Sequence, residues 1–324
     1  MANLFAILAL ITSLIIDLKF GELPEKIHPV VWIGKYIAFL KSKLKHSNPF
    51  IEKINGLILV IIITLTAILV IFFIFNLILD LENPIDNLWI YVITFIVYTL
   101  LLKSTYAIKA MSDIATNIQN IVEEDILTAR KEVAKIVGRD TSNLNEEGII
   151  SATIESIAES TVDGITSPMF YFSLFGLAGA YAYRAVNTLD SMVGYKDKEH
   201  INIGYFSAKI DMILNLIPSR ITAFVMILSA FILRKNWKNA FRILRRDKNN
   251  PESKIAGWPI SVMAGALDIQ LEKKGFYVIG DKNQELRPWH IKEALKIMKL
   301  TSLWFVLFSI IIMVFIGVIE WKIY

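Results

Sequence analysis

The stretch GLILVIIITLTAILVIFFIFNLIL (Gly56–Leu79) has no charged residue and is long enough to cross a lipid bilayer as one helix. A spanning helix needs about 20 largely apolar residues, because the hydrocarbon core of a bilayer is about 30 Å thick. The stretch LTSLWFVLFSIIIMVFIGVI (Leu300–Ile319) meets the same requirement. The chain of 324 residues, 55% of them apolar, is therefore predicted to be an all-α, polytopic integral membrane protein.

Four other apolar segments are weaker candidates for membrane helices, because each is short or interrupted. These segments are Ala2–Ile16, Leu88–Leu102, Thr166–Tyr183 and Met212–Leu233. Pro168, Gly176 and Gly179 interrupt the third segment, and Pro218 interrupts the fourth. We expect broken or re-entrant helices in these two segments, since such backbone is tolerated where protein or a wet cavity covers it.

The distribution of charge predicts how the chain is oriented. The net charge is +4, and the basic residues crowd Lys19–Lys53 and Arg234–Lys299. The loop Asp80–Asn87 carries acidic residues and no basic one. The positive-inside rule places the two basic segments in the cytoplasm and the acidic loop outside. We therefore predict a multi-pass protein of the cell membrane.

The polar segments 103–165 and 234–299 are both placed in the cytoplasm, as a helical insert and a basic segment. The two interrupted apolar segments must then both cross the membrane or both fail to cross. If both cross, Arg184–Asp211 faces outward. If neither crosses fully, all the polar stretches share one side. The helix breakers favour the second arrangement, which gives one membrane-embedded domain (1–324) with its active site facing the cytoplasm.

Several classes of site are excluded by what the sequence lacks. The chain has no cysteine, so disulfides, thiolate catalysis and cysteine-ligated metals are ruled out. It has no GxxxxGK[ST] loop, no HExxH and no G-x-S-x-G motif. The basic amphipathic stretch Lys35–Lys53 favours an interfacial helix on anionic lipid over nucleic-acid binding, since no nucleic-acid motif accompanies the charge. His28 precedes Pro29 and is interpreted as structural.

The segments around the polar region are predicted to be helical. Apolar residues recur at steps of three and four in Lys103–Val137, which predicts one long helix. Asn143 with Glu146 fits a capping box that opens the next helix. That helix is expected to reach about Val162 and to end at Asp163–Gly164. Later, Gly257–Leu267 indicates a loop with a short helix, and Lys273–Arg287 carries hairpin signals.

Three carboxylates, Glu155, Glu159 and Asp163, lie at i, i+4 and i+8. Successive steps of four drift by only about 40° around an α-helix, so the three side chains form one seam. The seam fits either a solvated acidic face or a Mg²⁺ site, since Mg²⁺ is bound by one or two carboxylates together with substrate phosphate. Arg220 lies inside an apolar run, where a buried carboxylate or a phosphate is the expected partner.

Six blocks of this sequence together resemble the CbiB/CobD family of cobalamin-biosynthesis proteins, the adenosylcobinamide-phosphate synthases. The blocks are D…GELP…HPVVWIG (Asp17–Gly34), GRDTSNLNEEGI (Gly138–Ile149), ESIAESTVDGITSPMF (Glu155–Phe170), NTLDSMVGYK (Asn187–Lys196), IPSRITA (Ile217–Ala223) and GWP…MAGAL (Gly257–Leu267). Two departures are noted: the family usually has Asn at the position of Ile255 and Gly at the position of Asp268.

The resemblance implies an ATP-dependent amide ligation. Adenosylcobyric acid would be joined through a propionate carboxylate to aminopropanol phosphate, or to aminopropanol, giving adenosylcobinamide phosphate. ATP and Mg²⁺ would be required, because a free carboxylate is a poor acyl donor. The implied partners are the corrinoid, the amine, membrane lipid and other cobalamin-pathway enzymes, with no nucleic acid.

On this hypothesis the polar residues take three roles. The predicted catalytic residues are Asp140, Glu159, Asp163 and Asp190, of which Glu159, Asp163 and Asp190 would hold the metal. The predicted phosphate-binding residues are Arg139, Lys196 and Arg220. The residues expected to orient substrate are Thr141, Glu155, Asn187, Ser191 and Asp211. The alternative is a membrane transporter or scaffold that binds corrinoid intermediates without ligating them, since broken helices also suit a translocation path.

Overall fold

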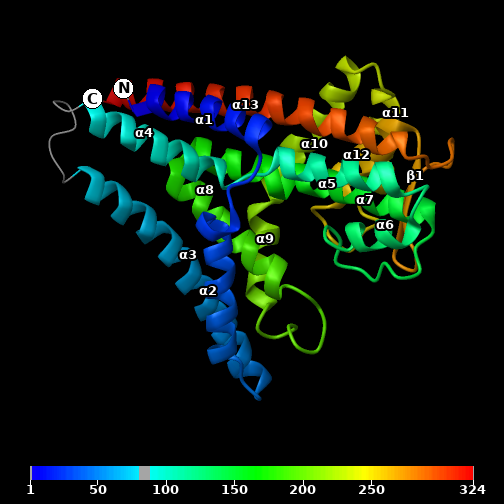
Figure 1. Ribbon diagram of the computed structural model, residues 1–324, viewed down its shortest axis with the longest axis horizontal. Coiled ribbons are helices and arrows are strands. Elements are labelled where there is room, and N and C mark those ends of the chain that lie inside the picture. Colours follow the sequence, from blue (N-terminus) through cyan, green and yellow to red (C-terminus); the bar gives the residue numbers. More distant parts are fainter. Residues whose placement is uncertain (1, 80–87, 324) are drawn as a thin grey trace. The chain divides into compact units, whose positions relative to one another are not determined.

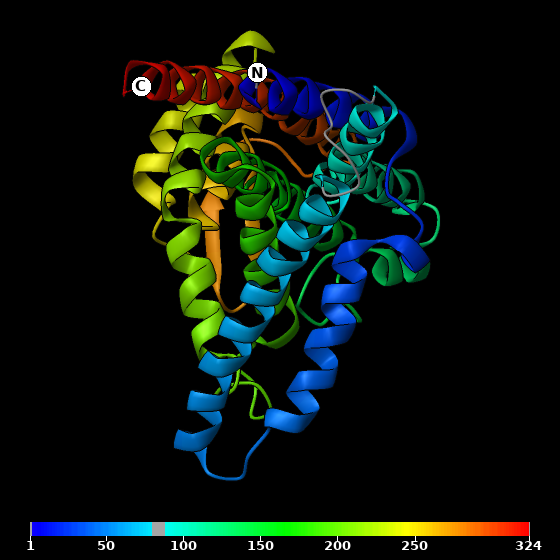
Figure 2. The ribbon, with the colours of Figure 1, turned by 90° about the vertical axis from the view of Figure 1, so that its left-hand side faces the viewer.

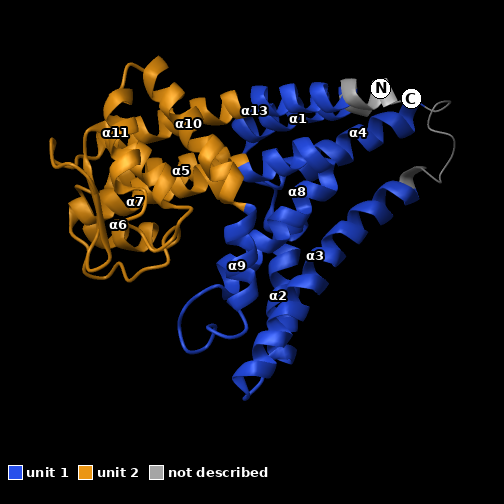
Figure 3. Ribbon diagram, turned by 180° about the vertical axis from the view of Figure 1, so that it is seen from behind, with its two compact units in different colours: residues 1–107, 167–214, 306–324 blue, residues 108–166, 215–305 orange. Residues whose placement is uncertain are grey.

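The computed structural model describes residues 2–79 and 88–323, and its contacts divide the chain into two compact units (Figure 3). Unit 1 contains residues 1–107, 167–214 and 306–324, and unit 2 contains residues 108–166 and 215–305. The single domain expected over the whole chain stays a prediction, and the acidic loop Asp80–Asn87 lies outside the described residues.

Figure 1 labels the elements along the chain. The elements of unit 1 are α1 (Ala2–Phe20), η1 (Glu25–Ile27), α2 (Pro29–Leu44), α3 (Pro49–Leu79), α4 (Leu88–Lys103), α8 (Ser167–Val193) and α9 (Tyr205–Leu214). The elements of unit 2 are α5 (Ile108–Ile121), α6 (Ile126–Val133), α7 (Glu146–Ser160), η2 (Thr161–Thr166), α10 (Leu216–Ile232), α11 (Trp237–Asp247), α12 (Gly257–Leu267), β1 (Gln270–Lys273) and β2 (Tyr277–Gly280). The final helix, α13 (Trp289–Ile323), contributes residues to both units.

Four helical stretches in the described part of the chain are long and apolar enough to cross a membrane. They are Pro49–Leu77, Leu88–Ile121, Tyr205–Ile232 and Trp289–Gly317. The prediction of an all-α, multi-pass membrane protein is therefore confirmed. The two uninterrupted apolar runs of the sequence form parts of α3 and α13. The weaker candidate Ala2–Ile16 forms part of α1, and Thr166–Tyr183 covers the last residue of η2 and the first part of α8. Neither α1 nor α8 is among these four stretches.

In unit 1, α8 packs against α2, α3 and α9. The helix α8 is broken at Gly176, whose backbone has φ 62° and ψ −157°. This conformation is open to glycine because it has no Cβ. The broken helix expected in Thr166–Tyr183 is therefore confirmed. The second interrupted segment also contains a break, since α9 ends at Leu214 and α10 begins at Leu216.

A buried ion pair joins α1 to α4 in unit 1. The Nζ of Lys103 lies 3.2 Å from Oδ1 of Asp17 and 2.8 Å from Oε2 of Glu22, and the side chains of Lys103 and Asp17 are fully buried. Oε2 of Glu22 also lies 2.8 Å from Nε2 of His28, whose Nδ1 accepts the N–H of Val30 at the start of α2. His28 therefore has the structural role that the sequence suggested.

The expected single helix over Lys35–Lys53 is wrong. The helix α2 ends at Leu44 and α3 begins at Pro49, and Figure 2 shows the two helices joined by a short turn. Proline has no N–H to continue a helix, and Oδ1 of Asn48 accepts the N–H of Phe50 in the next turn. Lys41 is held by Glu199, with 2.8 Å between Nζ and Oε1.

The single helix predicted over Lys103–Val137 is also wrong, because the chain forms the end of α4, then α5 and α6. Asp125 starts α6 by accepting the N–H of Thr128 with its side chain, and this cap favours a new helix over a continued one. The predicted apolar face is nevertheless buried. Its buried members are Ile108, Met111, Ala115, Ile118, Val122 and Ala129.

Two details of the next helix differ from prediction. Its N-cap is Asn145, whose Oδ1 accepts the N–H of Gly148, and not Asn143. The helix also does not end at Asp163–Gly164. Residues Thr161–Thr166 form the π-helix η2, and α8 begins at the next residue. Single π-helical turns are rare and are found frequently at functional sites.

In unit 2, α12 is the central element. It packs against α7, α10 and α11, and nearly all of its residues are buried. The strands β1 and β2 form an antiparallel hairpin that pairs Gln270 with Gly280 and Lys273 with Tyr277. The hairpin thus begins three residues before the segment in which the sequence suggested it.

The departure at Asp268 is explained by its backbone. Asp268 ends α12 in the left-handed conformation, with φ 55° and ψ 38°, a position where glycine is usual. Aspartate tolerates this conformation better than most residues. Its carboxylate also accepts hydrogen bonds from the side-chain amides of Asn236, at 2.9 Å, and Asn239, at 2.7 Å. These bonds stabilise an aspartate at a glycine position.

We expect Asp268→Ala to be less stable than Asp268→Gly. Both variants lose the bonds to Asn236 and Asn239, but only alanine places a Cβ in the left-handed conformation, at a cost of about 1 kcal/mol. Apparent unfolding temperatures of the two purified variants in the same detergent would measure the difference. Equal temperatures would show that the left-handed backbone does not select the residue at this position.

Candidate functional site

The carboxylate seam predicted from the sequence lies in unit 2. Glu155 and Glu159 are in α7, and Asp163 is in η2. Glu155 is buried, and Glu159 and Asp163 are partly buried. A run of acidic groups withdrawn from water needs either paired charges or bound protons. The three positions satisfy this need in different ways.

Glu155 is held by donors from three separate parts of the chain. Its Oε1 accepts hydrogen bonds from Nη2 of Arg139, at 3.0 Å, and from Oγ of Ser151, at 2.7 Å. Its Oε2 accepts one from the hydroxyl of Tyr277, at 2.6 Å. Ser151 also accepts the backbone N–H of Glu272 at 2.9 Å, which ties β1 to α7. The Glu155 carboxyl group is therefore held by one cation and two hydroxyl groups.

Burial, and then the negative charge of Glu155, raise the pKa of Tyr277 well above its usual range. The Tyr277 hydroxyl therefore keeps its proton at any physiological pH. It acts as a fixed donor to Glu155.

Glu159, one turn further along α7, is in a different state. Burial, and then the charges of Asp163 and Glu155, raise the pKa of Glu159 to about 8. Lys273 and Arg139 oppose this shift by attracting the charged form. Near pH 7 Glu159 therefore holds a proton most of the time, and it can give up or take a proton close to neutrality.

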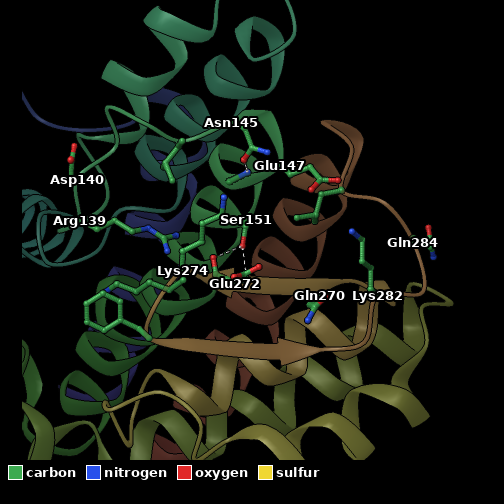
Figure 4. A pocket seen from close by; sticks show the side chains of 15 residues that line it. Arg139, Asp140, Asn145, Glu147, Ser151, Gln270, Glu272, Lys274, Lys282 and Gln284 are labelled. Atoms are coloured by element: carbon green, nitrogen blue, oxygen red, sulfur yellow. Dashed lines mark hydrogen bonds between the residues drawn. The ribbon is translucent and has the colours of Figure 1, made fainter.

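A cavity of about 310 Å³ opens beside this network, between the start of α7 and the β1–β2 hairpin (Figure 4). Its lining mixes cations, carboxylates and amides. The lining residues are Arg139, Asp140, Leu144, Asn145, Glu147, Gly148, Ser151, Gln270, Glu272, Lys273, Lys274, Phe276, Lys282, Gln284 and Leu286. Arg139 and Ser151 belong both to this lining and to the contacts of Glu155. The four cations and the N-terminus of α7 favour an anionic ligand.

In the loop before α7, the side chains of Arg139, Asp140 and Thr141 have three different surroundings. Arg139 pairs with Glu155. Asp140 is exposed at the edge of the cavity (Figure 4), and the N–H of Ser142 lowers the pKa of its carboxyl. The Thr141 hydroxyl donates to the carbonyl of Arg130 at 3.0 Å, which holds the loop against α6.

Five of the predicted site residues belong to unit 1. The Nδ2 of Asn187 lies 3.4 Å from Oδ1 of Asp211, and Oδ1 of Asn187 accepts a bond from Nη1 of Arg184 at 3.0 Å. The structure thus brings Asn187 and Asp211 together. The others in this unit are Asp190, partly buried, and Ser191 and Lys196, both exposed.

Arg220, in α10 of unit 2, has no carboxylate partner in the described part of the chain. Its guanidinium carbon lies 4.8 Å from the ring centre of Trp258, and Nη1 donates to the carbonyl of Leu216. The ammonium group of Lys248 lies at the same distance from that ring. The cation–π contact with Trp258 stabilises the guanidinium charge of Arg220, for which the sequence indicated that a partner is needed.

Within residues 2–79 and 88–323, no group of three or more His, Asp or Glu side chains is arranged to hold a metal ion by itself. Glu159 and Asp163 are close enough for the charge of one to raise the pKa of the other. Such a pair fits a Mg²⁺ ion that takes its other ligands from phosphate and water. Asp190 belongs to unit 1, and its place in the same metal site stays a prediction.

Sequence reasoning missed Ser151, Lys273 and Tyr277. Ser151 lies four residues before Glu155 on the same helix, so the spacing alone could have identified it. Tyr277 reaches Glu155 through the hairpin, over more than a hundred residues of chain. No local pattern in the sequence indicates that contact.

We expect Glu159→Gln to change how stability depends on pH. Because the folded protein binds the Glu159 proton more tightly than the unfolded chain, this group lowers the free energy of unfolding progressively as pH rises from about 4.5 to about 8. The variant should lose less stability than the wild type over that range, as measured by apparent unfolding temperature in detergent. Glu147→Gln, which changes an exposed carboxyl of the same helix, is the control. Parallel curves for the wild type and Glu159→Gln would contradict the assignment.

Comparisons with known proteins agree with the motifs. A family model described as CobD/Cbib protein matches residues 10–298. The probable cobalamin biosynthesis protein CobD of Methanothermobacter thermautotrophicus is 40% identical over 298 residues, which cover 92% of this chain and 95% of that protein. The cobalamin biosynthesis protein CobD of Dehalococcoides mccartyi is 34% identical over 305 residues, which cover 94% and 96%. No solved structure matches the chain. The chain therefore belongs to the CobD/CbiB family of cobalamin biosynthesis proteins.

Proposed function

We propose that this protein is a carbon–nitrogen ligase that joins adenosylcobyric acid to aminopropanol phosphate, or to aminopropanol, at the expense of ATP. The product is adenosylcobinamide phosphate when the amine carries the phosphate. The observation that carries the proposal is the network of Glu155, Arg139 and Tyr277, with Glu159 beside it. Next to this network is a cavity whose lining has four cations and three carboxylates. Family membership supports the pathway.

The reaction needs an activated carboxyl group. A propionate oxygen of the corrinoid attacks the γ-phosphorus of ATP, and ADP leaves. The amine nitrogen then attacks the acyl carbon, the amide bond forms, and inorganic phosphate leaves. Each step moves negative charge among phosphate oxygens, so fixed cations and hydrogen-bond donors lower both barriers.

The cations of the cavity supply such charge. Arg139 is oriented by Glu155, and a guanidinium held in this way can bind a phosphate with its other N–H groups. Lys273 and Lys274 line the same cavity from the hairpin. We assign the phosphates of ATP to this cavity. Lys196 and Arg220 remain proposed contacts for the phosphate of the second substrate.

Glu159 is the proposed base. The amine must lose a proton before or while it attacks, and a carboxylate whose pKa is raised toward neutrality accepts a proton better than an ordinary one. A substrate ammonium beside the seam would also favour the ionised form of Glu159. The proton would then pass from nitrogen to Oε of Glu159 as the amide forms.

Mg²⁺ would be held by Glu159 or Asp163 together with phosphate oxygens, and when bound it would neutralise phosphate charge. Asp163 is placed by the π-helical turn, and Asp190 is proposed as a further ligand. Asp140 lies at the cavity edge as another proposed catalytic carboxylate. The residues proposed to orient substrate are Thr141, Glu155, Asn187, Ser191 and Asp211.

The proposed setting is the cell membrane, with the site open to the cytoplasm, where ATP and the amine are found. The basic segments support this orientation through the positive-inside rule. Other cobalamin-pathway enzymes are proposed partners on the same side.

We expect Glu159→Gln and Asp163→Asn each to lower the rate of amide formation by about 10²-fold to 10⁴-fold, the range typical of lost acid–base or charge stabilisation. The assay contains purified protein, adenosylcobyric acid, ATP, Mg²⁺ and aminopropanol phosphate. Mass spectrometry detects the new amide, and released phosphate is measured in parallel.

The matched control is Glu123→Gln, which removes an exposed carboxylate in the turn after α5 of the same unit. It should leave the rate unchanged. Wild-type rates in both seam variants would remove the carboxylates from the mechanism. Corrinoid binding by the wild-type protein without any turnover would favour the transporter or scaffold alternative.

A further inference from the structure

The helices α10 and α11 lie side by side because both pack along α12. At the start of α12, the ring of Trp258 contacts Arg220 near the beginning of α10 and Lys248 just after α11, each at 4.8 Å. At the end of α12, the carbonyl of Ala266 accepts the N–H of Asn236, which directly precedes α11. The helices α10 and α11 are therefore antiparallel neighbours over most of the length of α12.

The outer face of α10 is apolar. Ile217, Phe224, Leu228 and Phe231 follow one another at helical spacing, and between 44% and 60% of each residue is exposed. At the end of this stripe, the ring of Phe231 lies 5.7 Å from that of Trp237, the first residue of α11. The exposed apolar surface thus continues from α10 onto α11.

The outer face of α11 is basic. Its exposed cations are Lys238, Arg242, Arg245 and Arg246. Arg242 and Arg246 are paired with Asp281. Lys238 and Arg245 lie over the exposed rings of Trp237 and Phe241, at 5.8 and 5.9 Å. In the part of the chain that the structure describes, neither of these two cations has a carboxylate partner.

If α10 crosses the bilayer upright, the apolar face of α10 and the basic face of α11 cannot both lie in favourable surroundings. Trp258 and Ala266 are eight residues apart, so α11 runs beside α10 for about 12 Å. The cations of α11 would then enter the hydrocarbon core, where exposed charge is strongly disfavoured. If both helices lie flat at the membrane surface, the apolar stripe meets acyl chains and the cations meet headgroup phosphates.

We propose that the α10–α11 pair lies in the plane of the membrane interface and that α11 binds the headgroups of anionic phospholipids. Length and composition alone place α10 within a candidate span, but the basic helix beside it favours the in-plane orientation. This surface is separate from the cavity assigned to ATP. It gives the protein a preference for anionic membrane that the ligase reaction does not require.

The first test measures depth in the bilayer. Because the chain has no cysteine, Ile217→Cys, Phe224→Cys and Leu228→Cys each provide a unique site for a spin label on the full chain in nanodiscs. Ile217 and Leu228 are eleven residues apart, or about 16 Å along the helix. Accessibility to oxygen and to a water-soluble relaxation agent should give one shared shallow depth for an in-plane helix. Depths that change steadily by about 16 Å would overturn the proposal.

The second test measures lipid preference. The protein is extracted from nanodiscs with equal phosphatidylglycerol and phosphatidylcholine, and the lipids it retains are counted by native mass spectrometry. Each cation near an anionic surface contributes about fivefold to binding, so Lys238→Gln with Arg245→Gln should strongly reduce the preference for phosphatidylglycerol. The control is Lys131→Gln with Lys254→Gln, which removes the same charge from exposed positions elsewhere in unit 2.

The control should keep the wild-type preference, and unfolding temperatures confirm that both double variants are folded. An unchanged preference in the Lys238 and Arg245 variant would overturn lipid binding by α11. In that case the basic face would be assigned to an acidic protein surface.

Discussion

The arrangement of unit 2 around its cavity depends on one buried carboxylate. Glu155 is buried, so its carboxyl oxygens need donors, which come from the loop before α7, from α7 itself and from the β1–β2 hairpin. Removing a donor from a buried charge costs more than the bond contributes when it is present. The hairpin, the loop and the helix are thus held together by an electrostatic requirement and not by apolar packing alone.

Glu159, the next carboxyl group along α7, is also withdrawn from water, but a bound proton and not a set of donors compensates its burial. Among the described residues Glu159 has no direct donor comparable to Arg139, and burial together with the neighbouring charges raises its pKa so that it keeps a proton near neutral pH. Two glutamates one helical turn apart therefore meet the cost of burial in different ways, Glu155 through hydrogen-bond donors and Glu159 through a bound proton. Asp163 follows in a π-helical turn, which shifts its side chain relative to the regular spacing of the seam. The three carboxylates therefore differ in hydrogen-bond partners, in bound proton or in local helix geometry, although they follow one another along α7 and η2.

Much of this could be predicted from the sequence, and the failures have identifiable causes. The apolar runs predicted α3 and α13, and the breakers predicted the interruption at Gly176, because membrane length and glycine conformation are local properties. The helix over Lys103–Val137 was predicted too long, since a single capping aspartate, Asp125, outweighs a continuous apolar periodicity. The carboxylate seam followed from spacing. The role of Tyr277 could not be predicted from the sequence, because it depends on how the β1–β2 hairpin packs on α7.

The ion pair between Lys103 and Asp17 bears on how the protein is made. The ammonium group of Lys103 is buried at a much lower cost in free energy when the carboxylate of Asp17 lies beside it. Asp17 belongs to α1, which precedes α2, α3 and α4 in the chain and is therefore synthesised before Lys103. The helix α1 therefore supplies the counter-ion for a lysine of the later helix α4.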